Sequence, residues 1–329
     1  RHLASTDLEA LGAEVILANT YHLMLRPGAD VVAALGGIHG FADWAGHVLT
    51  DSGGYQIYSL QPGLDDHGAT FTSTYDGSTH VFTPEDAAHV QASIGADIQM
   101  VLDVCPSSVA DRGVLRRAVD RTALWADRGR SAFLAHPDAS SRQCQFGIVQ
   151  GGTDEALRVE SARRTIEVGF DGYAVGGLSV GEERSEMLDG LDACVELLPA
   201  DRPRYFMGLG DPVGIVEAVG RGVDMFDCVL PTRHARHGTI LTDGGRYNLT
   251  RAEFASSDDP LDPHWSESPA ARYSRGYLRH LLLTREPTAP RLITLHNVAW
   301  LLRFMDRLAA AIRAGEFASF RSETLAVWS

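Results

Sequence analysis

Residues 222–238 read GVDMFDCVLPTRHARHG, and this segment says more about the chain than any other part of it. An apolar run typical of a buried strand carries one acid, Asp227, close to its end, and a cluster of arginines and histidines follows. A carboxylate in such a strand is costly unless it has a partner or a chemical role. The neighbouring cations suit a ligand that bears phosphates. The segment therefore predicts a strand that ends at a site for a polyanion; the alternative interpretation is a strand followed by a solvated basic turn.

Six earlier segments repeat the pattern of a short β-rich run followed by a helical stretch. We expect strands at residues 14–19, 48–51, 98–103, 145–149, 172–175, 204–208 and 224–229. We expect helices between them at residues 83–94, 114–135, 155–168, 184–198 and 212–221. This alternation predicts an α/β fold with a parallel sheet, specifically a TIM (β/α)8 barrel. The position of the eighth strand stays open: it lies before residue 1 or near residues 239–241.

Residues 250–271 break this alternation, because they are rich in Ser, Asp and Pro and are typical of a loop or a small insertion. A long amphipathic helix is expected at residues 298–314. We therefore expect one barrel domain over residues 1–329 that includes a small inserted subdomain near residues 245–297. Since the chain begins at Arg1 without a methionine, in amphipathic sequence, we also expect that an N-terminal segment precedes it.

Composition excludes several classes of protein. The 329 residues are 44% hydrophobic, which is ample for a large core. No apolar run approaches the roughly 20 residues of a membrane span, and no secretory signal pattern opens the chain. The four cysteines form no CxxC pair, which favours reduced thiols over a disulfide framework, and we therefore expect a cytoplasmic enzyme.

The basic residues narrow the chemistry further. All 29 of them are arginine, so a lysine Schiff base, a lysine-bound pyridoxal phosphate and a P-loop lysine are excluded. The net charge of −14 argues against tight non-specific binding of nucleic acid. It leaves room for one local patch of arginines.

Three acids and a glutamine stand at the ends of predicted strands: Asp51, Asp103, Asp227 and Gln150. In a barrel these ends meet at one mouth, where active sites form. Two carboxylates can divide the work at a glycosidic bond, one attacking the sugar carbon while the other moves protons. A third can read a base edge by accepting hydrogen bonds, and a glutamine offers both a donor and an acceptor. For Asp103, capping of a helix is an alternative role.

Other residues at the same strand ends suit a flat heterocycle. The backbone N–H groups of Gly177 and Leu178 are able to bind its carbonyl oxygen, and Tyr55 and Met207 are able to sandwich its ring, although both side chains also suit an ordinary core. Paired glycines allow close approach of the backbone to a ligand. They do not form GxGxxG after a first strand, so the sequence gives little support to a dinucleotide-binding fold.

Five motifs, in this order along the chain, resemble the bacterial tRNA-guanine transglycosylase family, also described as queuine tRNA-ribosyltransferases. They are NTYHL at 19–23, LTDSGGYQ at 49–56, GIVQGG at 147–152, GYAVGGLSVGE at 172–182 and the Asp227 segment. The resemblance spans essentially the whole chain. It implies a TIM-barrel pentosyltransferase of queuosine biosynthesis. Its partner is tRNA with a GUN anticodon, in which guanine at the wobble position is exchanged for a 7-deazaguanine base.

The resemblance also implies roles for individual residues. Asp227 matches the nucleophile, which forms a covalent ribosyl-aspartate, and Asp51 matches the general acid/base. The residues that match the base pocket are Asp103 and Gln150 at the guanine edge, Gly177 and Leu178 through their backbone, Tyr55 and Met207 as the stacking pair, and Cys105 and Val180. The last two match a pocket that favours 7-aminomethyl-7-deazaguanine over the larger queuine. Arg233 and Arg236 fall in the stretch that contacts tRNA.

One departure concerns zinc. The family carries a CxCxxC motif followed by a histidine, and alignment places its three cysteines at Trp265, Glu267 and Ala270, with the histidine retained as His296. One His and one Glu are too few ligands for a closed structural zinc site, so no metal and no other cofactor are expected. Trp265 is expected to replace the metal by apolar packing. Since the family uses this subdomain for tRNA docking and for its homodimer, the missing zinc ligands affect what we expect of tRNA docking and of the homodimer.

Three other functions stay open. The altered zinc region is compatible with a related transglycosylase that acts on DNA or at another RNA position. A non-catalytic tRNA-binding subunit with an active partner is a second alternative, although a pure scaffold has no need of both Asp51 and Asp227. A barrel enzyme for small molecules is a third, weakened by the lack of a metal triad or a phosphate-binding lysine.

Overall fold

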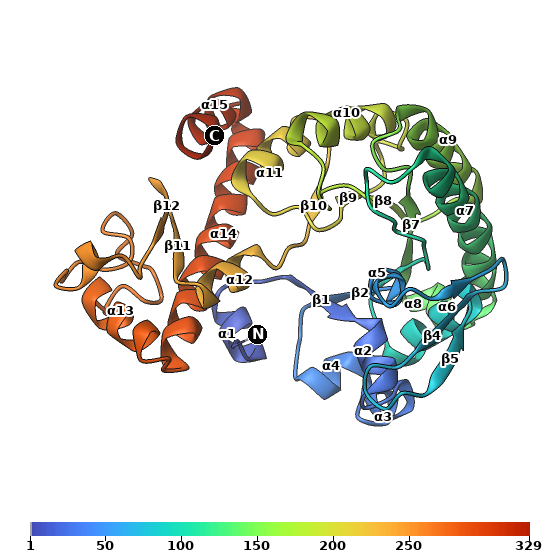
Figure 1. The fold of residues 1–329 in the computed structure, drawn as a ribbon, viewed down its shortest axis with the longest axis horizontal. Coiled ribbons are helices and arrows are strands. Elements are labelled where there is room, and N and C mark those ends of the chain that lie inside the picture. Colours follow the sequence, from blue (N-terminus) through green and yellow to red (C-terminus); the bar gives the residue numbers. More distant parts are fainter. Residues whose placement is uncertain (1) are drawn as a thin grey trace. The chain divides into compact units, whose positions relative to one another are not determined.

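A parallel sheet of seven strands organises the larger part of the chain in the computed structural model, which describes residues 2–329. Its strands follow one another in chain order: β1 (Val15–Asn19), β2 (His47–Asp51), β6 (Ile98–Met100), β7 (Cys144–Val149), β8 (Gly172–Val175), β9 (Arg204–Phe206) and β10 (Met225–Phe226). The sheet curls, as Figure 1 shows, and is consistent with a TIM-like barrel. The predicted α/β alternation is therefore confirmed.

Residues group into two compact units. One, the barrel unit, comprises residues 14–209 and 218–227; the other, the C-terminal unit, comprises residues 2–13, 210–217 and 228–329. All seven parallel strands and all three strand-end acids belong to the barrel unit.

Helices between the strands match the predicted ones within a few residues. They are α6 (Pro84–Ile94), α7 (Arg112–Ala135), α9 (Glu155–Val168), α10 (Arg184–Val195) and α11 (Pro212–Val219). Local sequence explains their ends: α6 begins with a capping box between Thr83 and Asp86 and has Pro84 at its first position. It stops where Gly95 adopts the left-handed conformation that suits glycine.

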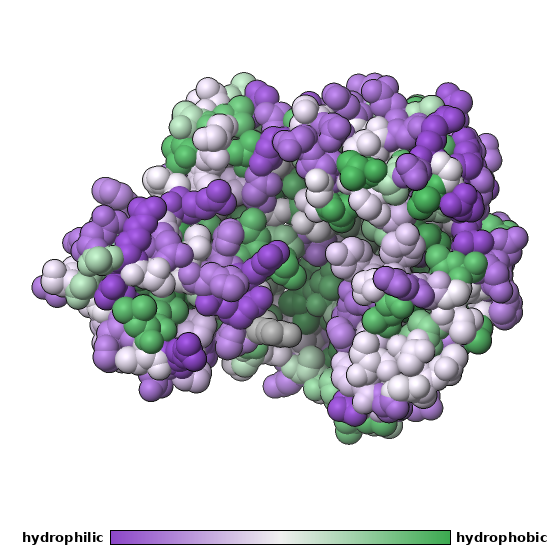
Figure 2. Space-filling view, viewed as in Figure 1, coloured by the Kyte–Doolittle hydropathy of each residue, from purple (hydrophilic) through white to green (hydrophobic). Residues whose placement is uncertain are grey.

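The core of the barrel unit lies around the buried strands of the parallel sheet. The central residues of β7 and β8 are buried on both faces, because helices cover the sheet on the outside. Ile148, Val175 and Phe206 have no exposed surface. In Figure 1 the helices α7, α9 and α10 run outside the strands, and in Figure 2 hydrophilic residues cover much of the same region.

The suggestion of an eighth strand near residues 239–241 is wrong. Residues Thr239–Thr242 form β11, which pairs antiparallel with β12 (Gly245–Asn248) in a separate two-stranded sheet. The physical reason lies in the two residues between these strands, Asp243 and Gly244, since Asp-Gly is a preferred two-residue hairpin turn. Within residues 2–329 the parallel sheet therefore ends at β1 and β10.

A small antiparallel sheet between β2 and α6 was not predicted. It consists of β3 (Gly63–Leu64), β4 (Ala69–Thr72) and β5 (Thr79–Phe82). Phe71 and Phe82 from this sheet pack with Tyr21 and Ile57 in a buried cluster. Short helices complete the barrel unit: α2 (Thr20–Leu25), α3 (Ala29–Ala34), α4 (Gly37–Ala42), α5 (Gly54–Ser59) and α8 (Ala139–Arg142).

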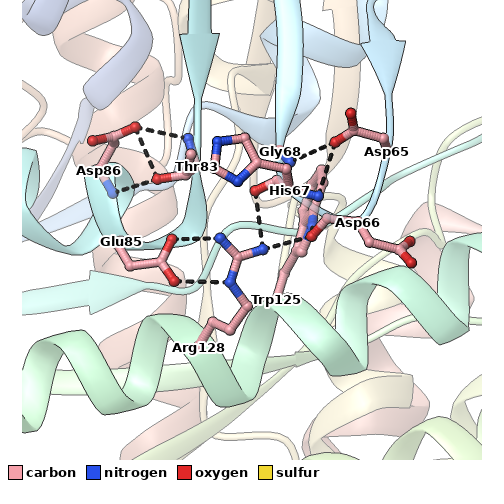
Figure 3. A network of polar contacts seen from close by, with 9 residues as sticks. All are labelled: Asp65, Asp66, His67, Gly68, Thr83, Glu85, Asp86, Trp125 and Arg128. Atoms are coloured by element: carbon pink, nitrogen blue, oxygen red, sulfur yellow. Dashed lines mark hydrogen bonds and ion pairs between the residues drawn. The ribbon is translucent and has the colours of Figure 1, made fainter.

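Polar contacts attach this small sheet to the helices beside it (Figure 3). The Arg128 guanidinium, on α7, donates two hydrogen bonds to the Glu85 carboxylate at 2.8 and 2.6 Å. It donates two more to the carbonyl oxygens of Asp66 and His67, in the turn between β3 and β4. The Trp125 indole donates to the same Asp66 carbonyl. One arginine thus joins that turn, the start of α6 and the middle of α7.

The C-terminal unit is mostly helical and has its own core. Its helices are α1 (Ser5–Ala10), α12 (Leu230–Arg236), the 3-10 turn η1 (Ala252–Phe254), α13 (Arg275–Leu283), α14 (Thr288–Ala314) and α15 (Phe317–Trp328). Ile240, Leu261 and Ile293 are among its fully buried residues. Residues 250–271 are largely turns, as predicted.

The long helix α14 begins ten residues earlier than the predicted start at residue 298. Pro290 near its beginning is compatible with a helix, because backbone N–H groups of the first turn have no intrahelical acceptor. Taken together, the helices of residues 2–329 include none with the length and apolarity needed to cross a bilayer.

Candidate active site

Asp51 ends β2 and is held by three hydrogen bonds. Its Oδ1 atom accepts from the backbone N–H groups of Thr20 at 3.0 Å and Gly53 at 3.1 Å, and its Oδ2 atom accepts from the Asn19 side-chain amide at 2.6 Å. The parallel register pairs Asp51 with Asn19, the last residue of β1. The ends of two neighbouring strands thus fix the orientation of this carboxylate.

The environment of Asp51 brings the pKa of its carboxyl close to neutral pH. Burial is the largest cause that raises its pKa, from 3.8 to about 7, and the charges of Asp227 and Asp103 act in the same direction. The hydrogen bonds from Thr20 and Gly53 oppose the rise. A pKa near the working pH suits a group that both gives and takes protons. The influence of Asp227 also means that the two acids lie close enough to interact.

Asp227 follows β10 directly and is oriented by two donors. Its Oδ1 atom accepts from the Tyr205 hydroxyl at 2.5 Å and from the Gly208 backbone N–H at 2.7 Å. Tyr205 is a buried residue of β9, paired in register with Met225. Sequence reasoning missed it; the available signal was a tyrosine on the strand next to the acid, since a buried hydroxyl needs a partner.

Asp103 and Gln150, the two predicted readers of the base edge, are in contact. The Gln150 amide nitrogen donates to Asp103 Oδ2 at 2.7 Å, and both side chains are buried. Burial raises the pKa of Asp103 to about 6, against the hydrogen bonds from Gln150 and Ser52. The alternative role of Asp103 as a helix cap is wrong, because the N-cap residue of the following helix, α7, is Asp111.

Gly177 and Leu178 lie in the buried turn after β8. Gly177 has a φ of +65°, and a Cβ atom there would approach Gln150 Oε1 to 2.2 Å. Both facts restrict this position to glycine. Cys105 lies in the same neighbourhood: burial, followed by the charge of Asp103, raises the pKa of its thiol to about 12. The thiol is therefore protonated and not a nucleophile.

The residues predicted to stack on a base differ in exposure. Tyr55, on α5, is 60% exposed, so its alternative role as an ordinary core residue is wrong. Met207 follows β9 and is partly buried. Val180 is 36% exposed, and its backbone N–H donates to the Glu182 carboxylate, which also accepts from the buried Ser108 hydroxyl. Sequence reasoning did not single out Glu182, which holds this turn in place.

Arg233 and Arg236 are both exposed and both lie on α12 of the C-terminal unit. The preceding strand is shorter than predicted, because β10 ends at Phe226 and the helix begins at Leu230. The cations therefore project from a helix rather than from a basic turn, which corrects the solvated-turn interpretation of this segment.

In the region aligned with the family's zinc motif, the retained His296 uses both of its ring nitrogens within the protein. Nε2 donates to the Leu241 carbonyl at 2.8 Å, so Nδ1 accepts from the Ser268 hydroxyl at 2.7 Å. The ring is fully buried, and burial lowers its pKa. The Trp265 ring lies 5.4 Å from it, between centroids.

These residues do not fit a structural zinc ion. The Trp265 ring contacts both His296 and the Arg303 guanidinium, which lies 4.8 Å from the ring centroid, and Ala270 is fully buried. A closed zinc site needs four donors with free lone pairs. Over residues 2–329, no group of three or more His, Cys, Asp or Glu side chains is arranged to hold a metal ion.

Comparisons with known proteins agree on one family. A family model described as queuine tRNA-ribosyltransferase matches residues 1–329. A protein of that name from Solidesulfovibrio magneticus is 49% identical over 330 residues, which cover 100% of this chain and 88% of the relative. Proteins of the same name from Nitratidesulfovibrio vulgaris and Thermotoga neapolitana are 47% and 46% identical, over 99% of this chain and 87% and 88% of theirs. The chain therefore belongs to the queuine tRNA-ribosyltransferase family.

Proposed function

We propose that this enzyme exchanges guanine at the wobble position of tRNA for a 7-deazaguanine base, in queuosine biosynthesis. Family membership supports the reaction class. The observation that carries the assignment of residues is the pair of acids at the ends of β2 and β10. One of them is oriented by two donors, and burial raises the pKa of the other to about 7, with the charge of the first acting in the same direction.

The first half of the reaction forms a covalent intermediate. The Asp227 carboxylate attacks C1′ of the ribose, and a C–O bond replaces the bond between C1′ and N9 of guanine. The electron pair of the broken bond stays on the base, which takes a proton from Asp51. Donors from Tyr205 and Gly208 keep the attacking carboxylate in one orientation, which lowers the entropic cost of reaching the transition state.

The second half reverses these steps with a different base. The Asp51 carboxylate takes the ring proton from N9 of the deazaguanine, N9 attacks C1′, and Asp227 leaves as a carboxylate. Two displacements at one carbon retain its configuration, as in retaining glycosidases. A pKa of about 7 serves Asp51 in both directions.

Asp103 and Gln150 read the base edge. The ionised Asp103 carboxylate accepts N–H hydrogen bonds from the pyrimidine ring, and Gln150 holds that carboxylate in place. The backbone of Gly177 and Leu178 binds the base carbonyl and side chain, and Tyr55 and Met207 stack on the ring. Cys105 and Val180 favour the small 7-aminomethyl substituent.

Arg233 and Arg236 bind tRNA phosphates. Their exposure on one helix supports this role in a chain whose net charge is −14, because phosphate contacts need only a local patch. On the family resemblance we further assign tRNA with a GUN anticodon as the partner, a homodimer as the assembly and the cytoplasm as the location. We also propose that the region around His296 is held together without zinc.

The direct test is incubation of the enzyme with bulk tRNA and each candidate base, followed by mass spectrometry of the nucleosides. We expect incorporation of 7-aminomethyl-7-deazaguanine into tRNA. Incorporation into duplex DNA but not tRNA would support the related DNA-directed transglycosylase. Absence of exchange and of any covalent RNA adduct, in a folded enzyme that still binds tRNA, would support the non-catalytic subunit.

A further inference from the structure

A fully buried arginine lies beneath the turns that carry the base-reading groups. Arg158, on α9, has no exposed surface. Its Nε atom donates to the Gly152 carbonyl at 2.7 Å, and Nη1 donates to the carbonyls of Val149 at 3.1 Å and Gly176 at 2.8 Å. All three acceptors are backbone oxygens, whereas a buried charge is usually paired with a carboxylate. So unusual an environment for a cation requires a reason.

Two of these three carbonyls stand next to a residue of the proposed pocket. Val149 precedes Gln150, and Gly176 precedes Gly177. The turns contain three glycines with positive φ, at residues 151, 152 and 177. Glycine adopts such conformations easily, but its backbone also moves out of them easily. Because a guanidinium is a rigid planar fork, it is able to hold the turns after β7 and β8 in one relative position.

The same guanidinium lies near the Gln150 side chain. Gln150 Oε1 and Arg158 Nη2 are both buried, and neither has a hydrogen-bond partner among the described residues. Both lie close to the position of a Cβ atom on Gly177, at 2.2 and 3.7 Å. A positive charge on this side favours the amide with its oxygen towards Arg158. Its NH2 group then faces Asp103, as observed.

A second contact from α9 acts on the same residue. One turn after Arg158, the buried Ser161 hydroxyl accepts the backbone N–H of Gln150 at 2.9 Å. The helix therefore holds both the backbone of Gln150 and, through charge, its side chain.

We propose that Arg158 is a positioning residue for base recognition: it locks the two glycine turns together and sets the orientation of the Gln150 amide. This inference rests on the proposed function of the site. It predicts that loss of the guanidinium weakens binding of the base more than it slows chemistry on a base that is already bound.

The test compares R158K and S161A with R130K as a matched control. Arg130, on α7, is a largely buried arginine that binds Asp171, the residue just before β8, and so lies at the opposite end of the strands. R158K keeps the charge, but one ammonium cannot span three carbonyls. We expect R158K to raise the KM for guanine, and the Kd for guanine from calorimetry, 10- to 100-fold, while kcat falls less than fivefold. S161A is expected to raise both constants three- to tenfold, and R130K to leave them unchanged.

The outcomes separate this inference from the proposed function. If the wild-type enzyme does not exchange labelled guanine into tRNA, the proposed function fails, whatever the variants do. If the wild type is active and a folded R158K keeps the wild-type KM and Kd, the positioning role is overturned. It is also overturned if kcat falls to the same extent in R158K and in the R130K control. Should R158K not fold, unchanged KM and Kd in S161A overturn it instead.

Discussion

Asp51 illustrates how one residue balances opposing effects. Three hydrogen bonds stabilise its charged form, yet burial and two neighbouring acids outweigh them and raise its pKa to about 7. A carboxylate with a pKa raised in this way costs stability, as is common for residues of active sites.

The effect of Asp51 on the free energy of unfolding depends on pH. Because the folded-state pKa of Asp51 lies above the ordinary value of 3.8, the folded protein binds this proton more tightly than the unfolded chain does. This group therefore lowers the free energy of unfolding as pH rises from about 4 to about 7, by at most about 4 kcal/mol. In D51N this loss is absent.

We predict that the Tm of D51N, relative to that of the wild type, increases between pH 5 and pH 8 in scanning calorimetry. D76N serves as the control, because hydrogen bonds from Ser78 lower the pKa of Asp76 to about 2, and its difference from the wild type is expected to be constant over this range. Parallel curves for D51N and the wild type would show that Asp51 has an ordinary pKa.

Tyr205 offers a separate prediction about Asp227, the proposed nucleophile. Y205F removes the hydroxyl that Asp227 accepts at 2.5 Å while preserving the buried ring. We expect kcat for guanine exchange to fall about 10- to 100-fold, since the attacking carboxylate loses one of its orienting donors, while the KM for the base stays within about twofold. A Y205F enzyme with wild-type kcat in steady-state exchange would remove this role from the hydroxyl.

Residue identities in the site were predictable only where position alone decided them. Asp51, Asp103 and Asp227 stood out because the ends of parallel strands share one edge of a sheet. Asn19, Tyr205 and Glu182 did not, since their importance depends on register and on which atom they reach.

Elements of the barrel unit followed from sequence wherever the helices were long and capped. The boundaries of α9 agree with the prediction at both ends. The sheet β3–β4–β5 was missed because its strands have two to four residues, too few for a periodic signal. Residues 239–241 were one of two places expected for the eighth barrel strand; they belong to β11 instead, because the Asp-Gly turn between β11 and β12 closes a hairpin.

Arg128 tests how the small sheet is attached. R128M removes four hydrogen bonds that join the β3–β4 turn, the start of α6 and α7. We expect the free energy of unfolding to fall by about 1–3 kcal/mol, because all four bonds are charge-assisted and the two to Glu85 are partly buried.

A matched exposed arginine supplies the comparison for R128M. Arg112 is 68% exposed and forms one ion pair with Asp154, so R112M is expected to cost no more than about 1 kcal/mol in urea titrations. Equal losses in the two variants would mean that the network in Figure 3 contributes no more than a surface ion pair.

At the scale of the whole molecule, membership of the family was predictable from the sequence. The interactions that stabilise the C-terminal unit were predictable only in part. The motifs identified the family, and the substituted cysteine positions pointed to packing by Trp265. The Ser268–His296 hydrogen bond and the stacking of Arg303 on Trp265 were not foreseen, because they depend on how the turns of residues 262–270 lie against α14.

This arrangement predicts a stability that does not depend on metal. Prolonged dialysis against a strong chelator is expected to leave the Tm unchanged, and elemental analysis is expected to find no stoichiometric zinc. S268A is expected to lower the free energy of unfolding by about 1–3 kcal/mol, because it leaves a buried ring nitrogen of His296 without a donor. A fall in Tm on chelation that zinc reverses would contradict the proposal.

The central claim, covalent catalysis by Asp227, is tested most directly by mass spectrometry of the protein after incubation with a tRNA anticodon hairpin and denaturation. The account predicts one protein–RNA adduct, located on the peptide that contains Asp227. Labelled base added before denaturation is expected to release this adduct, and D227N is expected to form none. An adduct on another residue, or exchange of labelled guanine by D227N at close to the wild-type rate, would contradict it.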